Sequence, residues 1–266
     1  MSLLKIPMLV SAYYAYYTVT TSPTARPRKN ERSRAPPGTN TNIMSRMWPS
    51  QVMCFHISLF LIFTCEILSI LATRYPNLPY ATSIASALTP TLSHNNIPLT
   101  PPSPPIDSSS YSPSVSTSIR ASTPFILGWL LVVGGTIRII CYRTLGRHFT
   151  FELAVRDQHR LVTSFPYSLV RHPAYIGTFC GFVGMAICLV SPGSWVAEQG
   201  WFNHGQSAGV WIARMYALTF VVWEVAVYAW LMKRMESEEK MLKKEFGKEW
   251  EEWASRVKWK MIPSVF

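Results

Sequence analysis

Long apolar runs alternate with short polar segments along the chain. Because the hydrocarbon core of a bilayer is about 30 Å thick, a helix of roughly 20 apolar residues is needed to cross it. Four runs meet or approach that length, at residues 52–73, 125–142, 175–190 and 211–232. The pattern predicts an all-α, multi-pass membrane protein in which these runs are transmembrane helices.

A fifth apolar run, residues 3–20, is weaker because it contains Lys5, Pro7 and four tyrosines between positions 13 and 17. A cleaved signal peptide is the competing interpretation, but tyrosines fit poorly with a small-residue cleavage site. We favour a first membrane helix, which gives a bundle of about five transmembrane helices.

The basic residues of the connecting segments alternate in density. Six Lys and Arg residues lie between positions 21 and 50, two between 74 and 123, five between 143 and 171, none between 191 and 210, and nine from 233 onward. Since basic loops stay on the cytoplasmic side of a membrane, this alternation predicts five spans with the N-terminus outside and the C-terminus in the cytosol.

Besides Lys5 in the weaker first run, four charged residues lie within the other apolar runs. Glu66 and Glu224 are near the middle, where an ionisable group is costly, so we expect each to make a buried polar contact. Arg138 and Arg214 lie nearer the ends of their runs, and we expect their side chains to snorkel toward water.

Composition supports the membrane interpretation. The chain is 48% hydrophobic and only 15% charged, and its net charge of +11 comes from short segments between apolar runs. Nucleic-acid-binding proteins cluster basic residues on a soluble face, so we expect no nucleic-acid partner. The five cysteines lie in or beside apolar runs without a CxxC pair, which predicts neither a metal site nor a disulfide framework.

These observations divide the chain into five parts. We expect a first membrane helix at 1–20, a disordered basic loop at 21–50, a membrane helix at 51–74 and a Ser/Thr/Pro-rich loop at 75–123. Such loop compositions bury too little apolar surface to fold. Residues 124–266 hold three membrane helices and two polar segments that carry the candidate chemistry.

The first polar segment, residues 145–177, mixes His, Arg, aromatic and turn-forming residues. Residues 155–162 suit an extended piece, and residues 164–167 suit a turn. Pro173 is well placed as the first residue of a helix. His172 then precedes a helix N-terminus, where backbone N–H groups point outward toward acceptor groups of a ligand.

The second polar segment, residues 233–263, predicts an amphipathic helix that continues out of the last span and is interrupted near Gly247. Its apolar face is formed by Met235, Leu242, Phe246 and Trp250. Arg234 and Glu238 are four residues apart and share a face close to the membrane surface. An ordinary exposed salt bridge is the alternative interpretation of this pair.

The motifs of these segments resemble those of a known family. The sequence has HxLVT at residues 159–163, Tyr167, RHPAYIG at 171–177, and RxxxEExxL at 234–242. The RHPxYxG element alone marks a superfamily of membrane methyltransferases and some membrane reductases. In this combination, over residues 125–263, the chain resembles the isoprenylcysteine carboxyl methyltransferases.

The resemblance implies a helical membrane enzyme that depends on S-adenosylmethionine. It would methylate the C-terminal carboxylate of prenylated cysteine in CaaX-processed proteins, at the endoplasmic reticulum membrane, with its active site facing the cytosol and membrane lipid around it. Arg234 would hold the substrate carboxylate. The residues implied in cofactor binding are Glu152, His159, Arg160, Leu161, Val162, Tyr167, His172, Pro173, Ala174, Tyr175 and Glu238. One departure is Phe165, which stands where the family commonly has Gly.

The chemistry agrees with these residue types. A carboxylate is ionised at neutral pH, so methyl transfer to it needs orientation and exclusion of water rather than a general base. A phospholipid or other small-lipid methyltransferase of the same superfamily would act on an amine, and Arg234 favours the carboxylate. A non-catalytic homologue is a further alternative, and a membrane reductase would need nicotinamide contacts that the sequence does not reveal.

Overall fold

The computed structural model describes residues 2–32, 43–88, 120–200 and 208–263. Within these ranges every regular element is a helix, and no strand is present. The helices are α1 (Ser2–Thr20), α2 (Lys29–Arg32), α3 (Ile43–Arg74), α4 (Ala81–Leu88), α5 (Thr123–Gly134), α6 (Ile137–Leu145), α7 (Pro173–Val190), α8 (Trp195–Gly200), α9 (Ala208–Phe246) and α10 (Lys248–Arg256), with a 3₁₀ turn at Gly146–His148. The predicted all-α class is confirmed.

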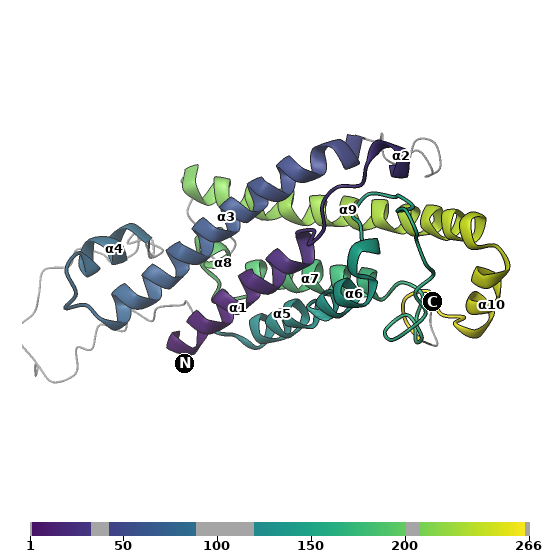
Figure 1. Ribbon diagram of the computed structural model, residues 1–266. Helices are drawn as coiled ribbons and strands as arrows, with labels where there is room; N and C mark the ends of the chain where they lie inside the picture. The colour runs from purple at the N-terminus through teal and green to yellow at the C-terminus, as the bar shows by residue number, and fades with distance from the viewer. Residues whose placement is uncertain (1, 33–42, 89–119, 201–207, 264–266) are drawn as a thin grey trace, which may run out of the picture.

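The long helices lie alongside one another in an elongated bundle (Figure 1). Helix α9 runs along much of the bundle and projects beyond it, where α10 folds back at one end. Helix α4 lies at the opposite end. Helix α9 ends and α10 begins on either side of Gly247. The φ of this residue is 51°, in a backbone conformation that is readily adopted only without a Cβ atom. The predicted interruption of the amphipathic helix is therefore confirmed.

Four helical stretches are long and apolar enough to cross a membrane: Pro49–Arg74, Thr123–His148, Pro173–Val190 and Val210–Phe246. They correspond to the four runs expected from the sequence. Helix α1 also packs inside the bundle, where Leu9, Ala12 and Val19 are buried. It does not belong to these four stretches, so its crossing of the membrane stays a prediction.

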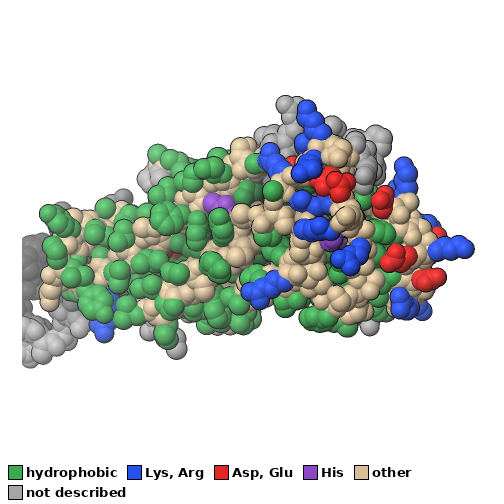
Figure 2. Space-filling view, in the orientation of Figure 1, with side chains coloured by type: hydrophobic (Ala, Val, Ile, Leu, Met, Phe, Trp, Pro, Cys, Tyr) green, Lys and Arg blue, Asp and Glu red, His purple; other side chains and the backbone are tan. Residues whose placement is uncertain are grey.

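Charged side chains gather at one end of the molecule, whereas apolar side chains cover most of the rest of the visible face (Figure 2). The charged end carries α2, α10 and the outer part of α9. Along the bundle, Ile212, Val222 and Val225 are among the large apolar side chains that remain exposed. An apolar surface of this extent suits contact with lipid rather than water.

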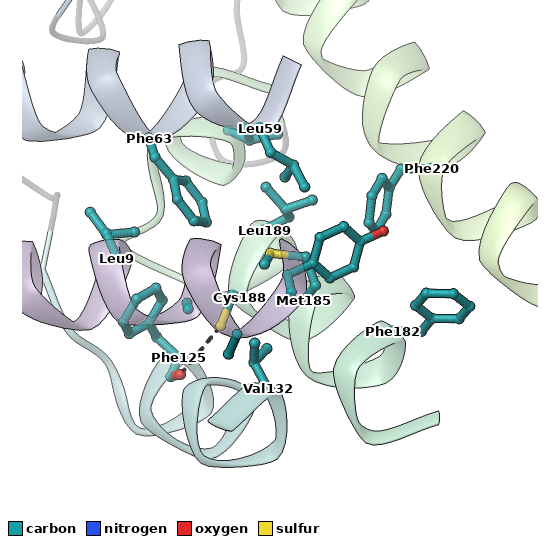
Figure 3. Packing of buried hydrophobic residues seen from close by; sticks show 14 of the residues in the cluster. Leu9, Leu59, Phe63, Phe125, Val132, Phe182, Met185, Cys188, Leu189 and Phe220 are labelled. Carbon is teal, nitrogen blue, oxygen red and sulfur yellow. Dashed lines mark hydrogen bonds between the residues drawn. The ribbon is translucent and has the colours of Figure 1, made fainter. Parts of the chain in front are cut away.

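The core joins α1, α3, α5, α7 and α9 through side chains that include Leu9, Leu59, Phe125, Met185 and Phe220 (Figure 3). Its tightest contact is between two helix backbones. A Cβ atom on Gly184 of α7 would lie 2.6 Å from the carbonyl oxygen of Gly128 on α5. Small residues that let helices approach this closely are typical of membrane bundles.

A buried ion pair lies at the end of the bundle opposite the charged end. Lys5 of α1 pairs with Glu66 of α3, and its Nζ also donates to the carbonyl oxygen of Gly193 at 2.7 Å. The backbone N–H of Trp195 donates to Glu66 Oε2 at 3.2 Å. The expected buried contact of Glu66 is confirmed, and it ties together α1, α3 and the turn before α8.

The other charged residues of the apolar runs behave differently from one another. Glu224 accepts a hydrogen bond of 2.9 Å from the Tyr16 hydroxyl, as expected for a buried acid. The Arg214 guanidinium lies 5.3 Å from the ring centre of Trp211. Arg138 is only 5% exposed and is hydrogen-bonded inside the protein. The prediction that Arg138 snorkels to water is therefore wrong.

Part of the segment expected to be disordered, residues 21–50, has a defined structure. Residues 29–32 form α2, and α3 begins at Ile43. Thr24 Oγ1 donates to the carbonyl oxygen of Phe149 at 2.8 Å, and Val155 N donates to that of Glu31 at 3.3 Å. The order there comes from long-range hydrogen bonds that composition does not reveal. In the loop at 75–123, α4 is helical, while residues 89–119 lie outside the described residues.

Candidate active site

A cavity of about 360 Å³ opens at the charged end of the bundle. Its walls come from the end of α1, residues 20–27, α3, α6, residues 148–162, Tyr167, residues 171–178 at the start of α7, α9 and α10. Known small-molecule sites are commonly clefts of about 300–1,000 Å³. The cavity therefore has the size of a ligand site, and it combines polar loop residues with apolar helix residues.

The structure brings eleven of the twelve site residues expected from the sequence to this cavity. They are Glu152, His159, Arg160, Leu161, Val162, Tyr167, His172, Ala174, Tyr175, Arg234 and Glu238. Pro173 is the exception: it is buried as the first residue of α7 and does not belong to the cavity wall. Its role is to begin the helix that carries Ala174 and Tyr175.

The turn before α7 is held by the C-terminal segment. The backbone N–H groups of Arg171 and His172 donate to the carbonyl oxygens of Trp259 and Lys260, at 2.9 and 2.7 Å. The His172 side chain makes no capping hydrogen bond to α7; its Nε2 lies 3.3 Å from Glu239 Oε1 on α9. His172 thus links three elements at the edge of the cavity.

Arg234 and Glu238 of α9 each contact another part of the cavity wall. Glu238 Oε2 accepts a hydrogen bond of 2.8 Å from the Tyr175 hydroxyl. Arg234 Nη2 lies 3.5 Å from the carbonyl oxygen of Thr150, and its guanidinium lies 5.7 Å from the ring centre of Trp230. Both side chains are partly buried, and among the described residues no ion pair joins them. The exposed salt bridge considered above is therefore the wrong interpretation.

Glu152 lies at the rim and is occupied by the segment after α1. Its Oε2 accepts a hydrogen bond of 3.2 Å from Arg32, and its Oε1 lies 3.7 Å from Arg26 Nε. These contacts fasten residues 20–27 over the cavity. Because two arginines lie against the Glu152 carboxylate, it attracts a cationic group of a ligand less strongly than Glu238 does.

Two histidines face each other on the loop wall. The ring centres of His148 and His159 are 4.8 Å apart, and within the described part of the chain the buried Nδ1 atom of each lacks a hydrogen-bond partner. Burial, and secondarily His148, lowers the pKa of His159 to about 4. His159 is therefore neutral at pH 7. Buried polar atoms without partners are rare unless a ligand or water satisfies them.

Tyr167 ends the expected turn, since its N–H donates to the carbonyl oxygen of Ser164 at 2.8 Å. A cis peptide bond joins Phe165 to Pro166. Burial raises the pKa of Tyr167, so its hydroxyl stays neutral. The Phe165 side chain is 56% exposed and does not line the cavity. The Phe165 side chain therefore takes no space from the cavity, although it replaces the Gly that the family commonly has at this position.

Sequence reasoning missed Arg138, which lines the cavity from α6. Its Nε donates to the Tyr142 hydroxyl at 2.8 Å, and its Nη1 donates to the Ala174 carbonyl oxygen at 2.9 Å and to Thr178 Oγ1. The signal available in the sequence was one arginine in an otherwise apolar run, which marks a functional position by default. Nothing in the sequence indicated that residues 20–27 cover the same cavity.

Comparison with known proteins agrees with the sequence motifs. Residues 126–198 match the isoprenylcysteine carboxyl methyltransferase (ICMT) family. The expected resemblance is confirmed. The match includes α7 and the RHPAYIG motif but ends before α9, so it does not reach Arg234 or Glu238.

Similar curated proteins carry related names. A probable protein-S-isoprenylcysteine O-methyltransferase of Oryza sativa subsp. indica is 32% identical over 130 residues, which cover 48% of this chain and 55% of the relative. The protein-S-isoprenylcysteine O-methyltransferase of Dictyostelium discoideum is 29% identical over 147 residues, covering 53% and 51%. The chain thus spans about half the length of these relatives. No solved structure matches it.

Proposed function

We propose that this protein is an S-adenosylmethionine-dependent methyltransferase that esterifies the C-terminal carboxylate of a prenylated cysteine. The observation that carries the proposal is the meeting of Tyr175, Arg234 and Glu238 at one cavity, where the charged end joins the apolar bundle. The names of the relatives point to the same reaction. The density of basic residues at this end favours its placement in the cytosol, and the family resemblance implies the endoplasmic reticulum membrane.

The residues present fit the cofactor. The Glu238 carboxylate suits its cationic amino group, and the unpartnered Nδ1 atoms of His148 and His159 suit the polar edge of a nucleoside. Leu161 and Val162 offer apolar contact for the ring. When bound, S-adenosylmethionine supplies a methyl group attached to a positively charged sulfur.

The acceptor fits the other side of the same cavity. Arg234 can bind a carboxylate through two parallel hydrogen bonds. Next to it, the wall is apolar and comes from Pro49 and Val52 of α3 and from Trp230 and Leu231 of α9. A prenyl chain surrounded by lipid can approach along these side chains while its carboxylate stays beside Arg234.

The residues then act by placement rather than by proton transfer. The acceptor carboxylate is ionised at neutral pH, so no base is needed. The site has to align the attacking oxygen with the methyl carbon and the sulfur, and holding them together contributes much of the rate. Transfer converts a carboxylate and a sulfonium into two neutral groups, and exclusion of water from the cavity favours this loss of charge.

The decisive experiment supplies labelled S-adenosylmethionine and a farnesylated cysteine analogue to membranes that contain the protein. We expect a base-labile methyl ester, and little ester from the same analogue without its farnesyl group. Methylation of phosphatidylethanolamine instead would identify a lipid methyltransferase. Absence of cofactor binding would identify a non-catalytic homologue and overturn the proposal.

A further inference from the structure

The cavity wall contains a buried cation for which the described residues provide no carboxylate. Arg138 lies on α6, inside the apolar stretch Thr123–His148, and is 5% exposed. None of the ion pairs among the described residues includes it. A charge held at this depth is costly unless it is neutralised or serves a function.

The hydrogen bonds of Arg138 leave part of its guanidinium unused. Nε and Nη1 donate to three neutral oxygens, those of Tyr142, Ala174 and Thr178. In the part of the chain that the structure describes, Nη2 makes no hydrogen bond, although a guanidinium offers five N–H groups. The rings of Phe149 and Phe151 lie 5.8 and 5.0 Å from the Arg138 Cζ atom. These contacts orient the cation without neutralising it.

The other charges of the wall are differently placed. Glu152 is occupied by Arg26 and Arg32 at the rim, and Arg171 pairs with Glu239 at 3.2 Å. Arg160 also lines the wall, but it is exposed. Arg138 and Arg234 therefore remain as the inner cations without a carboxylate partner among the described residues. The proposed reaction brings two carboxylates to the site: that of the acceptor and that of the cofactor's amino-acid group.

We propose that Arg138 binds the α-carboxylate of S-adenosylmethionine, which leaves Arg234 for the acceptor. This inference rests on the proposed function. Arg138 holds the carbonyl of Ala174, and the next residue, Tyr175, holds Glu238, the expected partner of the cofactor's amino group. Tyr167 lines the same cavity as Arg138 and Glu238. One turn of α7 thus connects a site for the amine with a site for the carboxylate.

The test compares ligands that differ in this carboxylate. The probes, given without an acceptor, are S-adenosylmethionine, decarboxylated S-adenosylmethionine, which lacks only the carboxylate, and 5′-methylthioadenosine, which has no amino-acid group. In nanodiscs we expect Arg138→Met to weaken S-adenosylmethionine binding about 10- to 100-fold, the size of a lost charged hydrogen bond. Binding of the other two probes should change less than about twofold, and Arg138→Lys should recover part of the loss.

Several outcomes would overturn the inference. Equal weakening of all three probes would give Arg138 a merely structural role, and an increased KM for the farnesylated acceptor with unchanged cofactor affinity would assign it to the acceptor. If Arg138→Met does not fold, the wild-type protein still decides. It should prefer S-adenosylmethionine over decarboxylated S-adenosylmethionine at least about tenfold, and equal affinities would exclude the carboxylate site. Failure of wild-type protein to bind any probe would instead overturn the proposed function.

Discussion

The two ends of the bundle bury charge in opposite ways. At one end Lys5 and Glu66 neutralise each other, and the backbone of the turn before α8 supplies their remaining hydrogen bonds. At the other end, Arg138 and Arg234 line a cavity without a carboxylate partner in the described part of the chain. A paired buried charge holds helices together, whereas an unpaired one is a cost that a ligand can offset.

The largest expected effect comes from removing one partner of the Lys5–Glu66 ion pair. Glu66→Ala leaves Lys5 buried and uncompensated, so we expect the free energy of unfolding to fall by about 3–5 kcal/mol. Denaturant titration in detergent micelles measures it, with the exposed Lys240→Ala as the matched control. The double variant Lys5→Met/Glu66→Leu should recover most of the loss. A double variant as unstable as Glu66→Ala would show that the pair does not act as a unit.

The cavity end should respond in activity rather than stability. We expect Arg234→Gln to raise the KM of the farnesylated acceptor and Glu238→Gln to raise that of the cofactor, each by about 10- to 100-fold, because each loses a charge-assisted hydrogen bond. Steady-state kinetics with one substrate varied at a time separates the two. Unchanged kinetics in both variants would refute the site assignment. If the variants instead lost as much stability as Glu66→Ala, the charges at the cavity end would serve folding, as the Lys5–Glu66 pair does.

A smaller effect concerns pH. Because burial lowers the pKa of His159 to about 4, below the ordinary value of about 6.5, the unfolded chain binds its proton more readily than the folded one. Its contribution to stability is full above about pH 6.5 and is lost as the pH falls toward 4. The free energy of unfolding, measured from pH 7.5 to 5, should decline less steeply in His159→Gln. Equal slopes would contradict the lowered pKa.

The smallest effect is expected at Phe165. Since its side chain is exposed and away from the cavity, Phe165→Gly should change kcat/KM less than about twofold, as surface substitutions usually do. Tyr167→Ala, two residues along on the cavity wall, is the matched comparison and should impair the enzyme clearly. A large gain in activity from Phe165→Gly would show that the bulky residue does distort the turn.

Local sequence signals predicted part of this molecule well. Pro173 marked the start of α7, and the helical spacing of Arg234 and Glu238 placed both on one face of α9. These features depend on residues a few positions apart. Arg138 was misjudged because its partners, Ala174 and Thr178, lie 36 and 40 residues away. The cover formed by residues 20–27 was missed for the same reason, since its contacts involve residues more than 100 positions later.

The close approach of Gly128 and Gly184 has a mechanical consequence. Helices α5 and α7 touch backbone to backbone at these two glycines, which have no side chain that can rotate aside, so the contact there is stiff. The wall between α3 and α9, by contrast, consists of side chains such as Val52 and Leu231, which can change rotamer. If the bundle has to yield to admit a lipid chain from the bilayer, the compliant side is the one between α3 and α9.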